Sequence, residues 1–126
     1  MRPYFHSLGF AVTGIVHALK SERNLKLFAT LYVISLLLGA FFGIDRVEWI
    51  LLVFTGAVFL AVELLNTALE HFSDAFDDHS KAQDDVHEAA IRATKDIAAG
   101  AALMCASAWG VTIILLFWPY AMTIMQ

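Results

Sequence analysis

The chain has 126 residues, a length that fits one domain, and it is 60% hydrophobic with only 16% charged residues. A soluble domain carries roughly a quarter charged residues, so this much apolar surface needs lipid or a partner subunit to cover it. The net charge of -4 excludes the basic footprint of a nucleic-acid-binding protein. The single cysteine, Cys105, excludes an intramolecular disulfide.

Residues 3–20 are the first segment with a clear pattern. Apolar side chains recur there with i, i+3, i+4, i+7 spacing, which predicts a helix with one apolar face. Both an amphipathic helix on the cytoplasmic surface and a plain membrane anchor fit this pattern. No uninterrupted apolar stretch follows a basic start, so we expect no cleavable signal peptide and targeting through later segments.

Three long apolar runs follow and predict three transmembrane helices. The first covers about residues 26–44 and includes 18 consecutive uncharged residues, near the lower limit for crossing about 30 Å of hydrocarbon. The second covers about residues 48–70 and contains one acid, Glu63, within its apolar interior. The third covers about residues 97–121 and has no charge. The sequence therefore predicts an all-α membrane protein.

The basic residues lie unevenly between the connecting segments. Of the eight lysines and arginines, only Arg46 lies between the first two spans, and none follows the third. By the positive-inside rule, the N-terminus and the 71–96 loop are expected in the cytoplasm. The 45–48 turn and the C-terminus are then outside it. We expect residues 1–126 to form a single membrane domain.

Acid and amide side chains recur where the second span reaches the cytoplasm. Glu63, Asn66, Glu70 and Asp74 are spaced by three, four and four residues, so on a helix they lie close to one stripe. An acid at the centre of a span costs roughly 3 kcal/mol on insertion scales, so Glu63 is a functional-site hypothesis. Carboxylates at the membrane boundary are hard oxygen ligands that suit Mg²⁺, which makes Glu70 and Asp74 candidates.

Three histidines and several further acids lie in the 71–96 segment. We interpret most of this segment as a solvated polar helix or loop. The spacing of His71, His79 and His87 lacks the tight pattern of a metal cluster, so their role stays open.

Lys95 and Asp96 stand where the third span begins. They are either an interfacial charge pair or a phosphate-contacting lysine beside an orienting aspartate. Glu22 adds another acid at the same cytoplasmic level. Interface acids, a buried acid and a lysine together match what phosphoryl transfer demands: a positioned metal, neutralised phosphate oxygens and an oriented nucleophile.

Three motifs resemble those of the bacterial small membrane diacylglycerol kinase family, which includes the undecaprenol kinases. Residues 63–70, ELLNTALE, followed by Asp74, resemble its E-x-x-N-[ST]-A-x-E-x-x-x-D signature. Residues 95–101, KDIAAGA, resemble its K-D-x-[AG]-[AS]-[AG]-A element. Residues 21–24, SERN, are similar to the E-R-N element before the first span of undecaprenol-type members. The motifs occur in the family's order along nearly the whole chain.

The resemblance implies an ATP-dependent kinase of the bacterial inner membrane that phosphorylates a lipid alcohol. It also implies a homotrimer with active sites shared between neighbouring subunits. By position, Glu63 is expected to act as the general base, and Glu22 and Glu70 are expected to hold Mg²⁺. The residues expected to contact the nucleotide are Asn66, Glu70, Asp74, Lys95 and Asp96. The resemblance assigns no lipid-binding residue.

Three departures from the family pattern bear on the substrate and the site. The segment from Asp74 to Lys95 is several residues longer than is usual. Phe10 stands where some diacylglycerol-type members have a tyrosine, and Phe28 stands where those members have an acid. These two phenylalanines, with the E-R-N element, favour undecaprenol as the substrate, while diacylglycerol stays open.

A non-catalytic protein is the alternative. A three-span assembly or ion-passage protein could use Glu63 as an intramembrane proton site. A proton path would need further ionisable residues deep in the spans, but the uncharged runs of the first and third spans contain none. The candidate residues gather at one interface instead, which favours the kinase.

Overall fold

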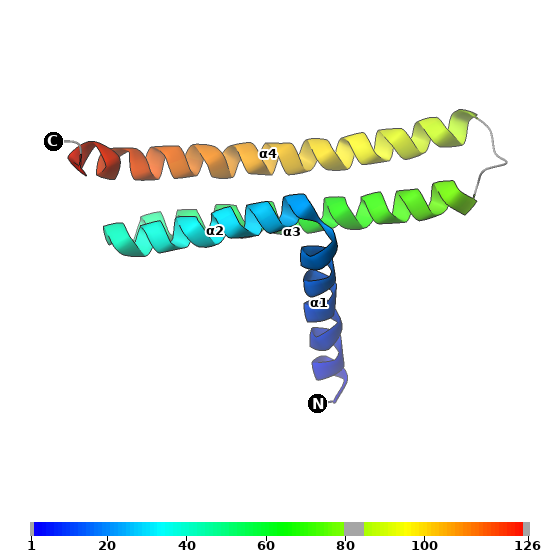
Figure 1. Cartoon of the computed structure of the whole chain (residues 1–126), viewed down its shortest axis with the longest axis horizontal. Helices are drawn as coiled ribbons and strands as arrows, with labels where there is room; N and C mark the ends of the chain where they lie inside the picture. Colours follow the sequence, from blue (N-terminus) through cyan, green and yellow to red (C-terminus); the bar gives the residue numbers. More distant parts are fainter. Residues whose placement is uncertain (1, 80–84, 125–126) are drawn as a thin grey trace.

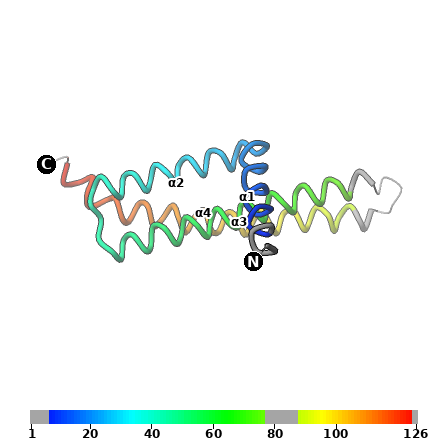
Figure 2. Tube along the Cα trace, turned by 90° about the horizontal axis from the view of Figure 1, so that it is seen from below, coloured from blue at the N-terminus to red at the C-terminus, as the bar shows by residue number. Residues whose placement is uncertain are grey.

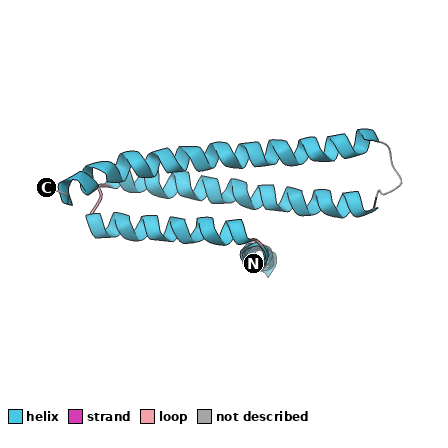
Figure 3. Cartoon of the chain, turned by 45° about the horizontal axis from the view of Figure 1, so that its top comes forward, coloured by secondary structure: helices cyan, strands magenta, loops and turns pink. Residues whose placement is uncertain are grey.

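A computed structural model describes residues 2–79 and 85–124 of the chain. Within these ranges every regular element is a helix (Figure 3). The elements in chain order are α1 (Arg2–Ser21), α2 (Arg23–Phe42), α3 (Arg46–His79) and α4 (Asp85–Ile124). The predicted all-α fold is confirmed for the part of the chain that is described.

Three of the helices lie side by side along the long axis of the molecule, and α1 leaves them at a steep angle (Figures 1 and 2). α3 and α4 form a long antiparallel pair, and α2 runs along part of it. By length and composition, α2, most of α3 and most of α4 can each cross a membrane, so the three-span prediction is confirmed. The position of α1 on a membrane surface stays a prediction.

α3 and α4 continue beyond the spans that the hydropathy pattern suggests. α3 has 34 residues, which at 1.5 Å per residue gives a length of about 51 Å. The hydrocarbon layer is only about 30 Å thick, so one end of the helix pair extends beyond it. The segment 71–96, expected as a loop with polar helical or loop structure, is therefore largely a continuation of these two helices. The side chains of His79 and His87 lie outside the described residues.

The turn between α2 and α3 has a local cause in its sequence. Gly43 adopts a left-handed conformation with φ of 64°, and its N–H bonds to the Gly39 carbonyl, which ends α2. Asp45 Oδ1 then accepts hydrogen bonds from the N–H groups of Val47 and Glu48 at 2.7 and 2.9 Å. Glu48 Oε2 accepts the Asp45 N–H in return at 2.8 Å, so the two side chains cap the start of α3 reciprocally.

An aromatic cluster joins the three long helices midway along their contact. Phe59 of α3 is 1% exposed. Its ring centroid lies 4.9 Å from that of Phe28 on α2 and 5.3 Å from that of Trp109 on α4. Tyr32 on α2 also meets Trp109, with ring centroids 6.1 Å apart. These contacts fix the mutual positions of the helices next to the polar residues discussed below.

Much of the remaining apolar surface is uncovered in the single chain. Phe41, Phe54 and Met104 are 77%, 67% and 76% exposed, respectively. Exposed large apolar side chains in this number mark surface that contacts lipid or another protein. Lipid or a further subunit therefore covers it.

Gly56 makes the aromatic cluster possible, and we expect Gly56→Ala to destabilise the fold. A Cβ at this position would collide with the Tyr32 ring and would lie 3.1 Å from Trp109 Nε1. Tyr32 cannot move freely because its hydroxyl donates to the Val53 carbonyl at 3.1 Å. Overpacking of this kind costs about 1–3 kcal/mol, which thermal unfolding in detergent would measure. Gly100→Ala is the control, because a Cβ there meets no atom within 4 Å. Equal unfolding temperatures for both variants would contradict the prediction.

Candidate active site

A polar pocket of about 260 Å³ lies where α2, α3 and α4 meet. Most of its lining is apolar or small, and its polar groups come chiefly from α3. The lining residues are Asn24 and Phe28 of α2, Phe59, Glu63, Asn66 and Glu70 of α3, and Ala99, Ala102, Leu103 and Ala106 of α4. The pocket therefore collects three of the predicted site residues from one helix.

The helical repeat explains why α3 presents these groups together. Glu63, Asn66 and Glu70 are three and four residues apart, so they lie on one face. The facing wall of α4 is built largely from alanines. Small side chains opposite the acids leave the space in which a ligand can lie.

The polar groups of the pocket are only partly satisfied. Asn66 Nδ2 donates to Glu70 Oε1 at 3.1 Å, but within residues 2–79 and 85–124 its buried Oδ1 has no hydrogen-bond partner. Glu63 is 8% exposed, and no described residue hydrogen-bonds to its carboxylate. Buried polar atoms without partners are costly, so the pocket is arranged to receive polar atoms of a ligand.

The oxygens of this pocket fit a divalent cation. Mg²⁺ prefers oxygen ligands such as carboxylates and amide carbonyls. Glu70 presents a carboxylate in this pocket, and Asn66 presents its amide Oδ1, which has no partner among the described residues. In the described part of the chain, however, no three acidic or histidine side chains converge as a ready-made metal site. A single chain therefore offers a partial ligand set.

Glu22, the other expected metal ligand, has a different neighbour. Its Oε1 lies 2.9 Å from His71 Nε2 on α3, and the two side chains are 31% and 50% exposed. Glu22 sits at the break between α1 and α2. The structure thus brings Glu22 into contact with α3 at His71, the residue after Glu70. Glu22 does not line the Glu63 pocket.

The remaining predicted residues lie further toward the end of the helix pair. Asp74 of α3 and Lys95 of α4 form an ion pair. Asp96 is exposed and has neither a hydrogen bond nor an ion pair with any residue that the structure describes. In one chain the predicted residues therefore fall into three groups, the Glu63 pocket, the Glu22–His71 pair and the Asp74–Lys95 pair, and Asp96 lies outside all three.

Two residues at the site were not assigned from the sequence. Asn24 lines the Glu63 pocket, and its place in the E-R-N motif was the available signal. His71 contacts Glu22 across 49 positions of the chain, a contact that no local pattern contains.

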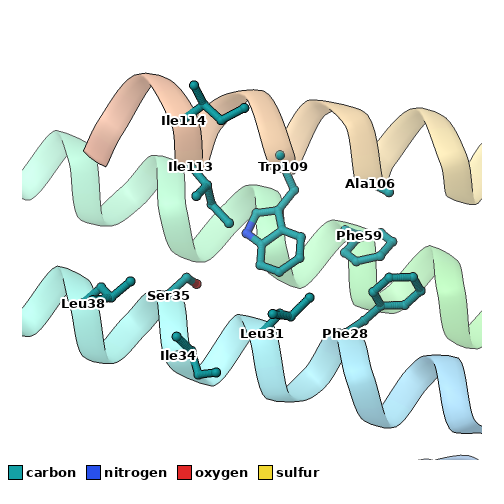
Figure 4. Close-up of a pocket in the computed structure, with 11 residues that line it drawn as sticks. Phe28, Leu31, Ile34, Ser35, Leu38, Phe59, Ala106, Trp109, Ile113 and Ile114 are labelled. Atoms are coloured by element: carbon teal, nitrogen blue, oxygen red, sulfur yellow. The ribbon is translucent and has the colours of Figure 1, made fainter. Parts of the chain in front are cut away.

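Two further cavities adjoin the polar groups. One of about 310 Å³ lies between α1 and α3 and has Thr67 and His71 in its wall. The other is an apolar groove of about 480 Å³ between α2 and α4. It shares Phe28, Phe59 and Ala106 with the Glu63 pocket (Figure 4). The groove and the Glu63 pocket are therefore adjacent, with these three residues in their common wall.

A buried acid in a pocket next to an apolar groove, on helices that can cross a membrane, suits an enzyme that acts on a lipid within its bilayer. Comparison with known proteins agrees with this class. The profile of the prokaryotic diacylglycerol kinase family matches residues 9–117, so the chain belongs to this family of membrane lipid kinases. The curated undecaprenol kinase of Bacillus subtilis (strain 168) is 30% identical over 116 residues, which cover 92% of this chain and 89% of that protein. The kinase interpretation is therefore preferred to the non-catalytic alternative.

The hydrogen bond between Asn66 and Glu70 gives a test of the pocket's geometry. We expect Asn66→Asp to destabilise the fold by about 1–3 kcal/mol, because it replaces the donor with an acceptor facing a half-buried carboxylate. Adding Glu70→Gln restores a donor and an acceptor in reversed order. The double variant should recover most of the loss in a thermal unfolding experiment in detergent. A double variant no more stable than Asn66→Asp would show that the two side chains do not interact.

Proposed function

We propose that this chain transfers the γ-phosphate of ATP to the hydroxyl of a membrane lipid alcohol, producing the lipid phosphate and ADP. The observation that carries the proposal is Glu63, a buried carboxylate without a hydrogen-bond partner among the described residues, in a pocket that shares three wall residues with an apolar groove. Membership in a lipid kinase family supports it.

Glu63 acts as the general base. Its carboxylate accepts the proton of the lipid hydroxyl as the oxygen bonds to the γ-phosphorus, while the bond from that phosphorus to the β,γ-bridging oxygen breaks and ADP leaves. The depth of Glu63 suits this role, because a lipid hydroxyl reaches it without leaving the membrane. Positioned proton acceptors contribute about 10²- to 10⁴-fold to such reactions.

The phosphate groups bind toward the boundary end of α3. Asn66 and Glu70 offer amide and carboxylate oxygens there for a bound cation. Lys95, which pairs with Asp74 four residues beyond Glu70, is a cation that can contact a phosphate. Bound Mg²⁺ would neutralise charge on the transferring phosphate, and Glu70 and Glu22 would hold it. Asp74 and Asp96 complete the nucleotide end of the site.

A homotrimer explains how separate groups act together. In one chain, Glu22 and Lys95 lie in pairs outside the Glu63 pocket, and large apolar surfaces are uncovered. Active sites shared between neighbouring subunits would bring the groups of two chains to one ligand. The N-terminus and the end of the α3–α4 pair face the cytoplasm in this arrangement, where ATP is available.

The lipid chain occupies the apolar groove between α2 and α4. Phe28 lies in the wall shared by groove and pocket, at the position where diacylglycerol-type members have an acid. An apolar side chain there suits a polyprenyl alcohol, whose hydroxyl is attached to hydrocarbon alone, better than diacylglycerol, whose hydroxyl lies next to polar ester groups. Together with the similarity to an undecaprenol kinase, this favours undecaprenol over diacylglycerol.

Glu63→Gln should lower phosphate transfer by at least about 100-fold, since the amide cannot accept the hydroxyl proton. The measurement is transfer of label from γ-labelled ATP to undecaprenol and, side by side, to diacylglycerol, with protein in lipid and Mg²⁺ present. Glu88→Gln is the control, because Glu88 is exposed on α4 and pairs with Arg92 away from the pocket. Full activity of Glu63→Gln, with an unchanged oligomer, would remove Glu63 from the role of base.

Gly110→Leu tests the groove. Gly110 lines it, and a Cβ there meets no atom within 4 Å, so the side chain adds bulk without a clash inside the chain. We expect a severalfold rise in KM for the lipid and no change in KM for ATP. The effect should be modest, because a lipid hydrocarbon chain that is excluded from the groove remains in the equally apolar bilayer.

The matched control is Ala108→Leu, on an exposed face of α4. A long isoprenoid alcohol should be affected more than a short-chain one. An unchanged KM for the lipid in Gly110→Leu would mean that the hydrocarbon chain of the lipid binds outside this groove.

A further inference from the structure

We propose that His71 is a positioning residue that holds the Glu22 carboxylate in place for the metal–nucleotide complex. The inference rests on the proposed function, because it takes Glu22 as a ligand of that complex. His71 itself touches neither substrate nor metal in this proposal. Its role is to set where the carboxylate of another segment stands.

Glu22 occupies a position in which a side chain normally has a local task. It is the residue before α2, with extended backbone angles of φ -94° and ψ 119°. Side chains at this position usually cap the helix by accepting a backbone N–H, and Ser, Thr, Asp and Asn are preferred. Glu22 makes no such bond. Its carboxylate is therefore available for a purpose outside its own helix.

His71 is the one described residue to which that carboxylate is bonded. Its Nε2 lies 2.9 Å from Glu22 Oε1, which leaves Oε2 to accept from a ligand. The imidazole projects from within the continuous helix α3 and has only two side-chain torsions. Glu22 lies between the helices α1 and α2 and has three side-chain torsions. The histidine has fewer torsions to restrict, so in this proposal it sets the position of the Glu22 carboxylate relative to α3.

The pair lies beside the catalytic pocket. His71 directly follows Glu70, and Asn24, two residues beyond Glu22, lines the pocket together with Glu63 and Glu70. Both members of the pair are partly exposed, at 31% for Glu22 and 50% for His71, so a ligand can reach the carboxylate. A bond here therefore couples the start of α2 to the acids of α3.

If the Glu22–His71 hydrogen bond only stabilised the fold, its loss would change stability and not ligand affinity. Exposed pairs of this kind contribute little to stability, whereas removing the hydrogen-bond partner of a ligating side chain typically weakens metal binding about 10- to 100-fold. The proposal therefore expects loss of ligand affinity with nearly unchanged unfolding.

The experiment uses the full chain in lipid nanodiscs. Mn²⁺ with a non-hydrolysable ATP analogue serves as the probe, and its dissociation constant is measured by electron paramagnetic resonance without turnover. We expect His71→Ala to raise this constant by about tenfold or more. His71→Gln, which keeps a donor, should raise it less. His17→Ala should leave it unchanged, because His17 lines the same α1–α3 cavity without bonding to Glu22. In a Glu22→Gln background, His71→Ala should add nothing further.

Three results would overturn the proposal. One is unchanged probe binding in His71→Ala when Glu22→Gln weakens it. Another is unchanged binding in Glu22→Gln itself. The third is an equal loss from His71→Ala with and without Glu22, accompanied by a lowered unfolding temperature, which is the signature of a structural tie. If His71→Ala does not fold, the same comparisons apply to His71→Gln. Phosphate transfer by the unmodified chain is scored separately, so failure of the lipid kinase proposal is distinguished from failure of this one.

Discussion

The constraint on which this structure depends is the exclusion of charge from hydrocarbon. A carboxylate on a transmembrane helix is tolerated only where it faces protein or a cavity, so the position of Glu63 determines which face of α3 turns inward. Phe28, Phe59 and the alanines of α4 then surround that face with apolar side chains and leave space beside the acid. The lipid-facing sides of the helices need no such specificity and are simply apolar.

Residue pattern was sufficient for the helices and for the acid stripe of α3. Hydropathy and helical periodicity report directly on which face meets lipid, and these determine the three spans and the spacing of Glu63, Asn66 and Glu70. The hydropathy pattern bounded the spans but left open whether the 71–96 segment is helix or loop, because polar residues that extend a helix into water give no hydropathy signal. The motif resemblance supplied the family, which the match over residues 9–117 confirms.

The contacts between distant segments could not be read in the same way. The Glu22–His71 and Asp74–Lys95 pairs depend on where α1 ends against α3 and on how α3 and α4 are registered. Both depend on how the helices pack, which the local sequence pattern does not predict. The steep departure of α1 is likewise a consequence of the extended residue at position 22, whose sequence context permits several geometries. The aromatic contacts around Gly56 also could not be predicted from the local sequence. A glycine there is required only because Tyr32 and Trp109 pack against it.

The unbroken course of α3 has a consequence for depth. Because the helix has no kink-forming proline between Glu63 and Glu70, these side chains are separated by two turns, or about 10 Å of rise along the axis. Neither can move up or down without the other. Under the proposed function, this spacing sets how far below the level of Glu70 a lipid hydroxyl has to lie to meet Glu63, so a lipid alcohol whose hydroxyl lies nearer the membrane surface would not reach the base.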